Sequence, residues 1–97
     1  MSTAFSREQI IAAHQHCTNN RAELMRSEIC ACTYCFTTFS SSAIADWVEE
    51  MTVDNALPPD QWTALCPNCP VDAVMGSASG YPVTDQRFLE AMHKHWF

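Results

Sequence analysis

The segment ICACTYCF, residues 29–36, places three cysteines close together, at Cys30, Cys32 and Cys35. A second close pair, Cys66 and Cys69, lies in ALCPNCP, residues 64–70. Cys32–Cys35 and Cys66–Cys69 share the C-x2-C spacing, and residues 36–65 separate them. Two thiolates at this spacing can converge on one ion from a single tight turn, and zinc prefers four such ligands in a tetrahedron. The pattern therefore points to a metal site built from two turns.

The sequence predicts one structural zinc ion per chain, held by Cys32, Cys35, Cys66 and Cys69. Such a closed set leaves no open coordination position, which argues against catalysis by the metal. Two alternatives remain: His93 as a fourth ligand beside three cysteines, or Cys30 in place of an expected ligand. Cys17 is predicted to be a buried core thiol, and Cys30 is predicted to be buried as well unless it replaces a ligand. Asp72 is predicted to accept hydrogen bonds that fix the second turn.

Length and composition indicate a small globular protein. The chain has 97 residues, of which 47% are hydrophobic and 16% charged, and this predicts a single domain over residues 1–97. Its start has no apolar run typical of a secretory signal, and no segment has the length that a membrane span needs. We therefore predict a cytoplasmic protein with no membrane partner. Clustered cysteines in a reducing compartment more often bind metal than form disulfides.

Local patterns predict helices at both ends of the domain. A helical part is expected over 6–27, where Ser6 and Gln9 fit a capping box. A final helix is expected over 84–96, capped by Thr84, with one apolar stripe. The stripe comprises Phe88, Leu89, Met92 and Trp96.

Between these helices, residues 29–75 are predicted to form a zinc-knuckle core. Residues 29–39 favour extended backbone. Residues 43–51 are predicted to be helical, because Ile44, Trp47, Val48 and Met51 share one helical face. A short strand over 62–65 is expected to pair as a hairpin with 71–75. The predicted fold is a mostly helical α+β domain with a zinc-ribbon-like pair of knuckles and a short β-hairpin.

The distribution of charge narrows the choice of partner. The formal net charge is -6, and no Lys or Arg lies between Arg26 and Arg87. A phosphate-binding surface requires clustered basic residues, so this region argues against nucleic acid. An acidic surface instead suits a basic protein partner. The candidate partner-binding residues are Asp46, Glu49, Glu50, Asp54 and Asp60.

From residue 28 onward the chain resembles a family of small bacterial proteins known mostly as "cytoplasmic protein". The segments that carry this likeness are CACTYCF (30–36), TALCPNC (63–69), SGYP (79–82), FL (88–89) and MHKHWF (92–97). The resemblance implies a zinc-ribbon-like cytoplasmic fold. Some members of the family lie beside secreted antibacterial toxins, which implies an immunity role. One departure is Pro70, which follows the second knuckle where such turns favour glycine and which is expected to exclude a positive φ.

These observations predict a non-enzymatic, zinc-stabilised protein-binding domain. The leading hypothesis is an immunity protein that binds a basic toxin domain and occludes it with the acids of 43–51 and the loop 52–61. One alternative is a zinc-ribbon adaptor in transcription, translation or other cytoplasmic machinery. The other is an enzyme that uses Cys17 or the histidines.

Overall fold

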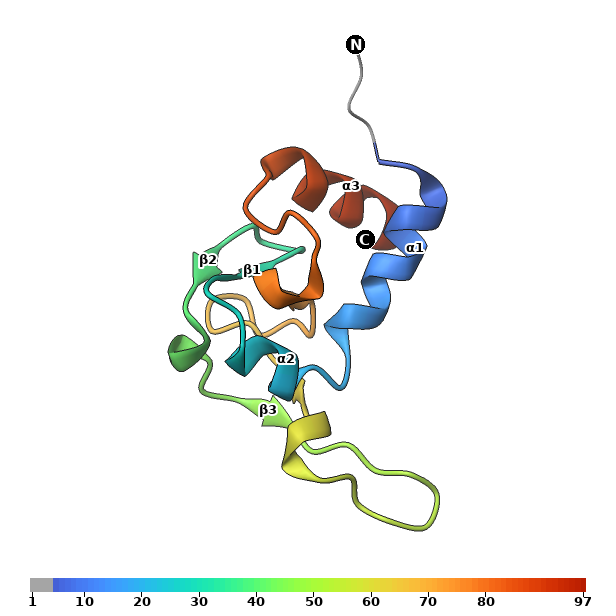
Figure 1. Ribbon diagram of the computed structural model, residues 1–97, viewed down its shortest axis with the longest axis vertical. Helices are drawn as coiled ribbons and strands as arrows, with labels where there is room; N and C mark the ends of the chain where they lie inside the picture. The colour runs from blue at the N-terminus through green and yellow to red at the C-terminus, as the bar shows by residue number, and fades with distance from the viewer. Residues whose placement is uncertain (1–4) are drawn as a thin grey trace.

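Two short antiparallel sheets organise the chain, and three α-helices lie beside the larger sheet (Figure 1). The computed structural model describes residues 5–97. The larger sheet has the strand order β2-β1-β5, with β1 at Cys30–Cys32, β2 at Thr38–Phe39 and β5 at Val74–Gly76. Cys30 pairs with Phe39 on one side and with Gly76 on the other. The first cysteine segment is therefore the central strand of the fold.

The smaller sheet supports a loop that projects from the body of the domain. It consists of β3 at Trp47–Val48 and β4 at Thr63–Ala64, with Trp47 opposite Ala64. Between these strands, residues 49–61 extend away from α1 and α3 (Figure 1). We call residues 49–61 the projecting loop. It contains an isolated bridge between Met51 and Ala56 and ends in a 3-10 turn, η3, at Pro59–Gln61.

The helices at both ends occur where the sequence predicts them. The N-terminal part contains α1 at Arg7–His14, the 3-10 turn η1 at Gln15–Cys17, and α2 at Arg21–Met25. The capping box of Ser6 and Gln9 is confirmed, with both reciprocal hydrogen bonds present. The last helix, α3, spans Gln86–Trp96. The predicted cap at Thr84 is wrong by one residue, because the Asp85 carboxylate accepts the amide of Arg87.

The main core lies between α1, α3 and the larger sheet. Buried side chains from α1 and η1 meet buried side chains from α3 over the inner residues of β1 and β5. The predicted stripe of α3 is confirmed for three of its four members, whereas Trp96 is 37% exposed. The cluster comprises Ile10, Ala13, Cys17, Ala31, Met75, Val83, Phe88, Leu89 and Met92. A second cluster around Leu24, Cys30 and Val74 joins the larger sheet to the smaller one.

Two predictions about the secondary structure are wrong, one about the helix content of the domain and one about residues 43–51. The domain is not mostly helical, since helical residues make up 39% and strand residues 15% of it. The helix over 43–51 does not form. A 3-10 turn, η2, spans Ser41–Ala43, and Trp47–Val48 pair as a strand with β4. Aromatic and β-branched residues favour a paired strand, and this pairing replaces the helical face. Met51, which that face would have buried, is 71% exposed.

The predicted hairpin between 62–65 and 71–75 is also wrong. β4 pairs with β3, and β5 pairs with β1, so the two segments belong to different sheets. A single backbone hydrogen bond, from the Cys66 amide to the Val71 carbonyl at 3.0 Å, closes the turn between them. The short hairpin near the knuckles is instead formed by β1 and β2, around the first C-x2-C pair.

Gly76 lies at a closely packed point, where β5 ends and the 3-10 turn η4, Ser77–Ser79, begins. A Cβ at this position would lie 2.1 Å from Ser27 Oγ and 2.9 Å from Leu24 Cδ2. Because Ser27 Oγ also accepts the Ala78 amide, it cannot move without losing that bond. We expect Gly76→Ala to lower the free energy of unfolding by about 1–3 kcal/mol in urea denaturation.

The matched control is the double variant Ser27→Gly/Gly76→Ala, which removes the nearest clashing atoms. It should lose less stability than the sum of the two single variants. Additive losses would show that the approach of Gly76 to Ser27 is not the cause.

Candidate metal centre

The first knuckle is the turn that joins β1 to β2. The Cys32 amide donates to the Thr37 carbonyl at 3.0 Å, and the Phe36 amide donates to the Cys32 carbonyl at 2.9 Å. The Cys32 sulfur accepts the amides of Tyr34 at 3.3 Å and of Cys35 at 3.5 Å. Phe36, directly after the second cysteine, has a positive φ of 67°. The turn therefore directs both sulfurs of the pair to one side.

The second knuckle repeats this geometry. The Cys66 sulfur accepts the amides of Asn68 at 3.3 Å and of Cys69 at 3.4 Å. Pro70 occupies the position that corresponds to Phe36, and its φ is 31°. The expectation that Pro70 excludes a positive φ is therefore wrong. The backbone here follows the same turn as the one after Cys35, where Phe36 also has a positive φ.

The larger sheet brings the two knuckles together. Cys32 of β1 pairs with Val74 of β5, and Thr33 donates both its amide and its hydroxyl to the Ala73 carbonyl, at 2.8 and 3.2 Å. These contacts fix the chain just after Cys69 against the start of the first turn. The sequence spacing identifies the pairs, and the sheet supplies the contact between them.

The four sulfurs of Cys32, Cys35, Cys66 and Cys69 lie within 4.8 Å of one another and could hold a metal ion. The Sγ–Sγ distances across the knuckles are 3.6 Å for Cys32–Cys69 and 3.7 Å for Cys35–Cys66. A tetrahedron of sulfurs each about 2.3 Å from a central ion has edges of about 3.8 Å. The donor set thus fits a tetrahedral thiolate-preferring metal.

Within the described residues 5–97, the two alternative ligands, Cys30 and His93, do not belong to this group of four sulfurs. Cys30 is fully buried in the core cluster around Leu24. The His93 ring packs against the rings of Tyr34 and Phe36, with centroids 5.3 and 5.6 Å away. The predicted set of four cysteines therefore accounts for the cluster by itself.

The sulfurs differ in their readiness to ionise. Burial raises the pKa of the Cys32 thiol well above its ordinary value. Burial also opposes ionisation of Cys35, but hydrogen bonds from Thr37 and Asn68 outweigh it and lower that pKa to about 6. Without a cation, four thiolates this close would repel one another. A divalent ion supplies the charge that allows all four to ionise together.

Sequence reasoning missed two residues that contact the sulfurs. The Asn68 side-chain amide donates to Cys35 Sγ at 3.6 Å and to Thr37 Oγ1 at 3.3 Å, and Thr37 Oγ1 also lies 3.3 Å from Cys35 Sγ. Asn68 thus links the second knuckle to a sulfur of the first. Asp72 was predicted to orient the second knuckle, but its side chain is exposed and acts electrostatically on Cys17. Asn68 makes the contact with a sulfur instead. The polar residue inside C-P-N-C was the available signal.

Cys17, considered above as a nucleophile, is confirmed as a core residue with 2% exposure. Burial and the charge of Asp72 raise its pKa to about 12. The thiol therefore stays protonated near neutral pH, which makes it a poor nucleophile. The neighbouring His14 stacks on Trp96, with ring centroids 3.9 Å apart.

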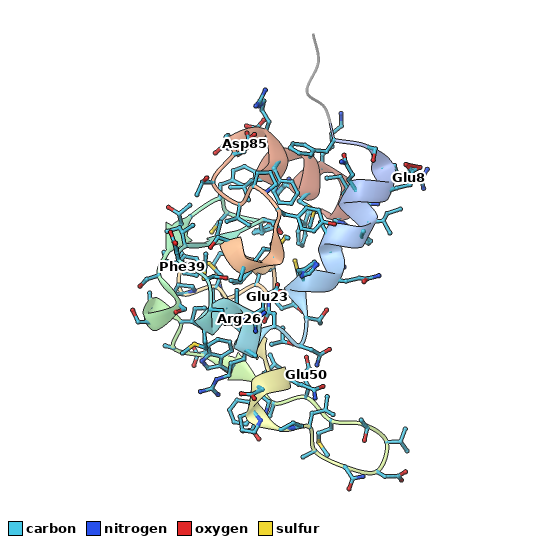
Figure 2. The ribbon with its side chains drawn as sticks, viewed as in Figure 1. Glu8, Glu23, Arg26, Phe39, Glu50 and Asp85 are labelled. Carbon is cyan, nitrogen blue, oxygen red and sulfur yellow. The ribbon has the colours of Figure 1, made fainter. Side chains whose placement is uncertain are left out.

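The predicted partner-binding acids lie on the smaller sheet and the projecting loop. Asp46 precedes β3, and the other four lie within residues 49–61. Asp46, Glu49, Asp54 and Asp60 are exposed. Glu50 is half-buried and accepts a hydrogen bond from the Thr63 hydroxyl where the loop meets the body of the domain (Figure 2).

Comparisons with protein-family models, with curated proteins and with solved structures found no match to this chain. Within residues 5–97, no helix combines the length and apolar character that crossing a membrane requires.

Replacing a buried ligand should abolish metal binding. We expect elemental analysis to find one metal ion per purified wild-type chain and essentially none in Cys66→Ala, because three sulfurs hold the ion much more weakly. Loss of the ion should also reduce the far-UV circular dichroism, since metal binding contributes directly to folding. Cys30→Ala is the matched control, because Cys30 is buried but lies outside the cluster. An unchanged metal content in Cys66→Ala would contradict the assignment.

Proposed function

We propose that the ion held by the four cysteines is zinc and that its role is structural. Four thiolates in a tetrahedron suit zinc and leave no position for water or substrate. Within residues 5–97 the buried apolar side chains form two small clusters, of nine and eight residues, so an ion that joins the two knuckles supplies cohesion that a chain this small would otherwise lack.

The proposed function is non-enzymatic protein binding by the projecting loop, and the observation that carries it is the exposure of that loop. Val53 is 100% exposed and Met51 is 71% exposed. Apolar side chains held this far into solvent gain free energy only when a partner covers them. The exposed acids Glu49, Asp54 and Asp60 lie in the same loop, and no lysine or arginine lies between Arg26 and Arg87. This combination suits a concave, basic protein surface.

The base of the loop is held in place, which favours binding without a large ordering cost. The Arg21 guanidinium lies between the rings of Trp47 and Trp62, 5.0 and 5.1 Å from their centroids. The Asn19 side chain donates to the Gln61 carbonyl at 2.8 Å, and the Arg21 amide donates to the Trp62 carbonyl at 3.0 Å.

Hydrogen bonds within the loop continue this order outward. The Leu57 amide donates to the Glu50 carbonyl at 2.9 Å, and the Thr52 amide donates to the Asn55 carbonyl at 2.7 Å. The Glu50 carboxylate contributes chiefly by accepting from Thr63, so we assign it to positioning the loop as well as to the acidic surface.

The specific proposal is an immunity protein that acts in the cytoplasm and neutralises a toxin domain by occlusion. The loop would enter the toxin's basic site, where its acids replace the contacts of an anionic substrate. The resemblance to small cytoplasmic proteins found beside toxin genes supports this choice. The six cysteines, all free thiols in the structure, suit a reducing compartment.

Reversing the charge of the loop should abolish tight binding. We expect Glu49→Lys/Asp54→Lys/Asp60→Lys to weaken the Kd for the toxin domain encoded next to this chain's gene by at least about 100-fold, measured by calorimetry. Wild-type affinity should also fall as salt is raised from low to physiological ionic strength, since exposed charges are screened.

The control reverses exposed acids elsewhere, in Glu8→Lys/Glu28→Lys/Glu90→Lys, which changes the net charge equally. Equal effects of the two triple variants would show that net charge rather than the loop matters. Absence of any binding by the wild-type chain would reject the immunity proposal.

A further inference from the structure

We propose that Arg21 is a binding site for a carboxylate, which an aspartate or glutamate side chain of the protein partner supplies. This inference rests on the proposed function, because it adds an anchoring contact at the base of the projecting loop to the contacts of the loop itself. The partner surface then carries both signs of charge: a basic site for the loop and an acidic side chain beside it.

Two indole rings hold the Arg21 guanidinium. Its central carbon lies 5.0 Å from the ring centroid of Trp47 and 5.1 Å from that of Trp62. Trp47 belongs to β3 and Trp62 directly follows η3, so the stack joins α2 to both ends of the projecting loop. The backbone is fixed as well, since the Arg21 amide donates to the Trp62 carbonyl at 3.0 Å. The guanidinium is therefore held in place without the use of its N–H groups.

The N–H edge of this guanidinium is open to solvent. Within residues 5–97, the Arg21 side chain donates no hydrogen bond and forms no ion pair. In the same residues, every buried side-chain nitrogen and oxygen atom has a hydrogen-bond partner. Arg21 is only half-buried, so its unpartnered nitrogens must be the part of it that reaches water. The donors are thus available to an incoming acceptor.

The acids of the chain leave this edge free. Asp46, Glu49 and Asp60 each lie within two residues of one of the two tryptophans, yet none of them pairs with Arg21. In a chain with a formal net charge of -6, this positive charge is left to a carboxylate from outside. The same acids would repel a run of phosphates, so a single carboxylate on a protein suits the site better than nucleic acid does.

A carboxylate also matches the geometry of the edge. The planar guanidinium presents parallel N–H groups that two carboxylate oxygens accept together, and such bidentate pairs are strong and directional. Because the indoles already hold the guanidinium, binding a partner orders little that is not already ordered. Met25, one helical turn from Arg21 on α2, is 57% exposed, so a partner that reaches the guanidinium can also cover apolar surface. Arginine and tryptophan are the residue types that most often anchor protein interfaces.

The test uses Arg21→Lys in the full-length chain, together with the toxin domain encoded next to this chain's gene. The substitution keeps the positive charge but removes the paired donors, so the Kd should weaken by roughly tenfold. A carbodiimide couples an amine directly to a carboxylate. It should join the introduced amine to an aspartate or glutamate of the toxin domain, and mass spectrometry maps the product. The wild-type chain has one lysine, Lys94 on α3, so a cross-link through position 21 is readily assigned.

Arg26→Lys is the matched control, because Arg26 is exposed, caps the end of the same helix and lies outside the indole stack. It should change the Kd by less than about twofold and give no cross-link to the toxin domain. A complex that forms without a cross-link at position 21, or equal cross-linking from the two variants, would overturn the proposal.

A titration of the isolated wild-type chain separates this site from the proposed function. Sodium acetate should shift the NMR signal of the Arg21 Nε–H saturably, whereas sodium chloride at the same ionic strength should not, and the Arg26 signal should stay in place. If the toxin domain does not bind but acetate does, the immunity proposal fails and the carboxylate site stands. If neither binds, or if inorganic phosphate shifts the Arg21 signal at lower concentration than acetate does, the carboxylate assignment is wrong.

Discussion

The whole domain depends on the approach of four cysteine sulfurs to within 4.8 Å of one another. Such an arrangement is unfavourable for bare thiolates and favourable once a cation neutralises them. The backbone of the two knuckles has the same geometry. In each knuckle two backbone amides donate to the first sulfur, and the residue after the second cysteine has a positive φ.

The candidate site could be predicted from the sequence because its information is local. The C-x2-C spacing at Cys32–Cys35 and Cys66–Cys69 dictates which sulfurs share a turn, and a metal site with four ligands requires that the two turns meet. Asn68 escaped prediction because its partner, Cys35, lies on the other knuckle. A contact between residues 33 positions apart leaves no periodic trace in the chain. The helices at the two ends were predictable for the same local reason, since capping and apolar spacing define them.

The middle of the fold could not be predicted because its pairing is nonlocal. Ile44, Trp47, Val48 and Met51 do share a helical spacing, yet Trp47 and Val48 pair with Ala64 and Thr63 instead. Similarly, β5 pairs with β1 across more than forty residues rather than with its neighbour β4. Strands of two or three residues carry too little alternation to identify a partner. Their pairing depends on contacts between distant segments, which strands this short do not display in the sequence.

The same constraint explains how so small a domain can extend a loop into solvent. In a chain of 97 residues, apolar side chains are needed in the core, yet Met51 and Val53 are left outside it. An ion held by the four sulfurs would link residues 32–35 to residues 66–69 and close the chain on both sides of the segment between them, so the loop would not need to contribute to burial. Arg21 then orients its base by lying between Trp47 and Trp62, one indole on each strand side of the loop. Cohesion from a bound ion and a preorganised projecting surface would therefore be two consequences of one arrangement. This links the stability of the centre to any function carried by residues 49–61.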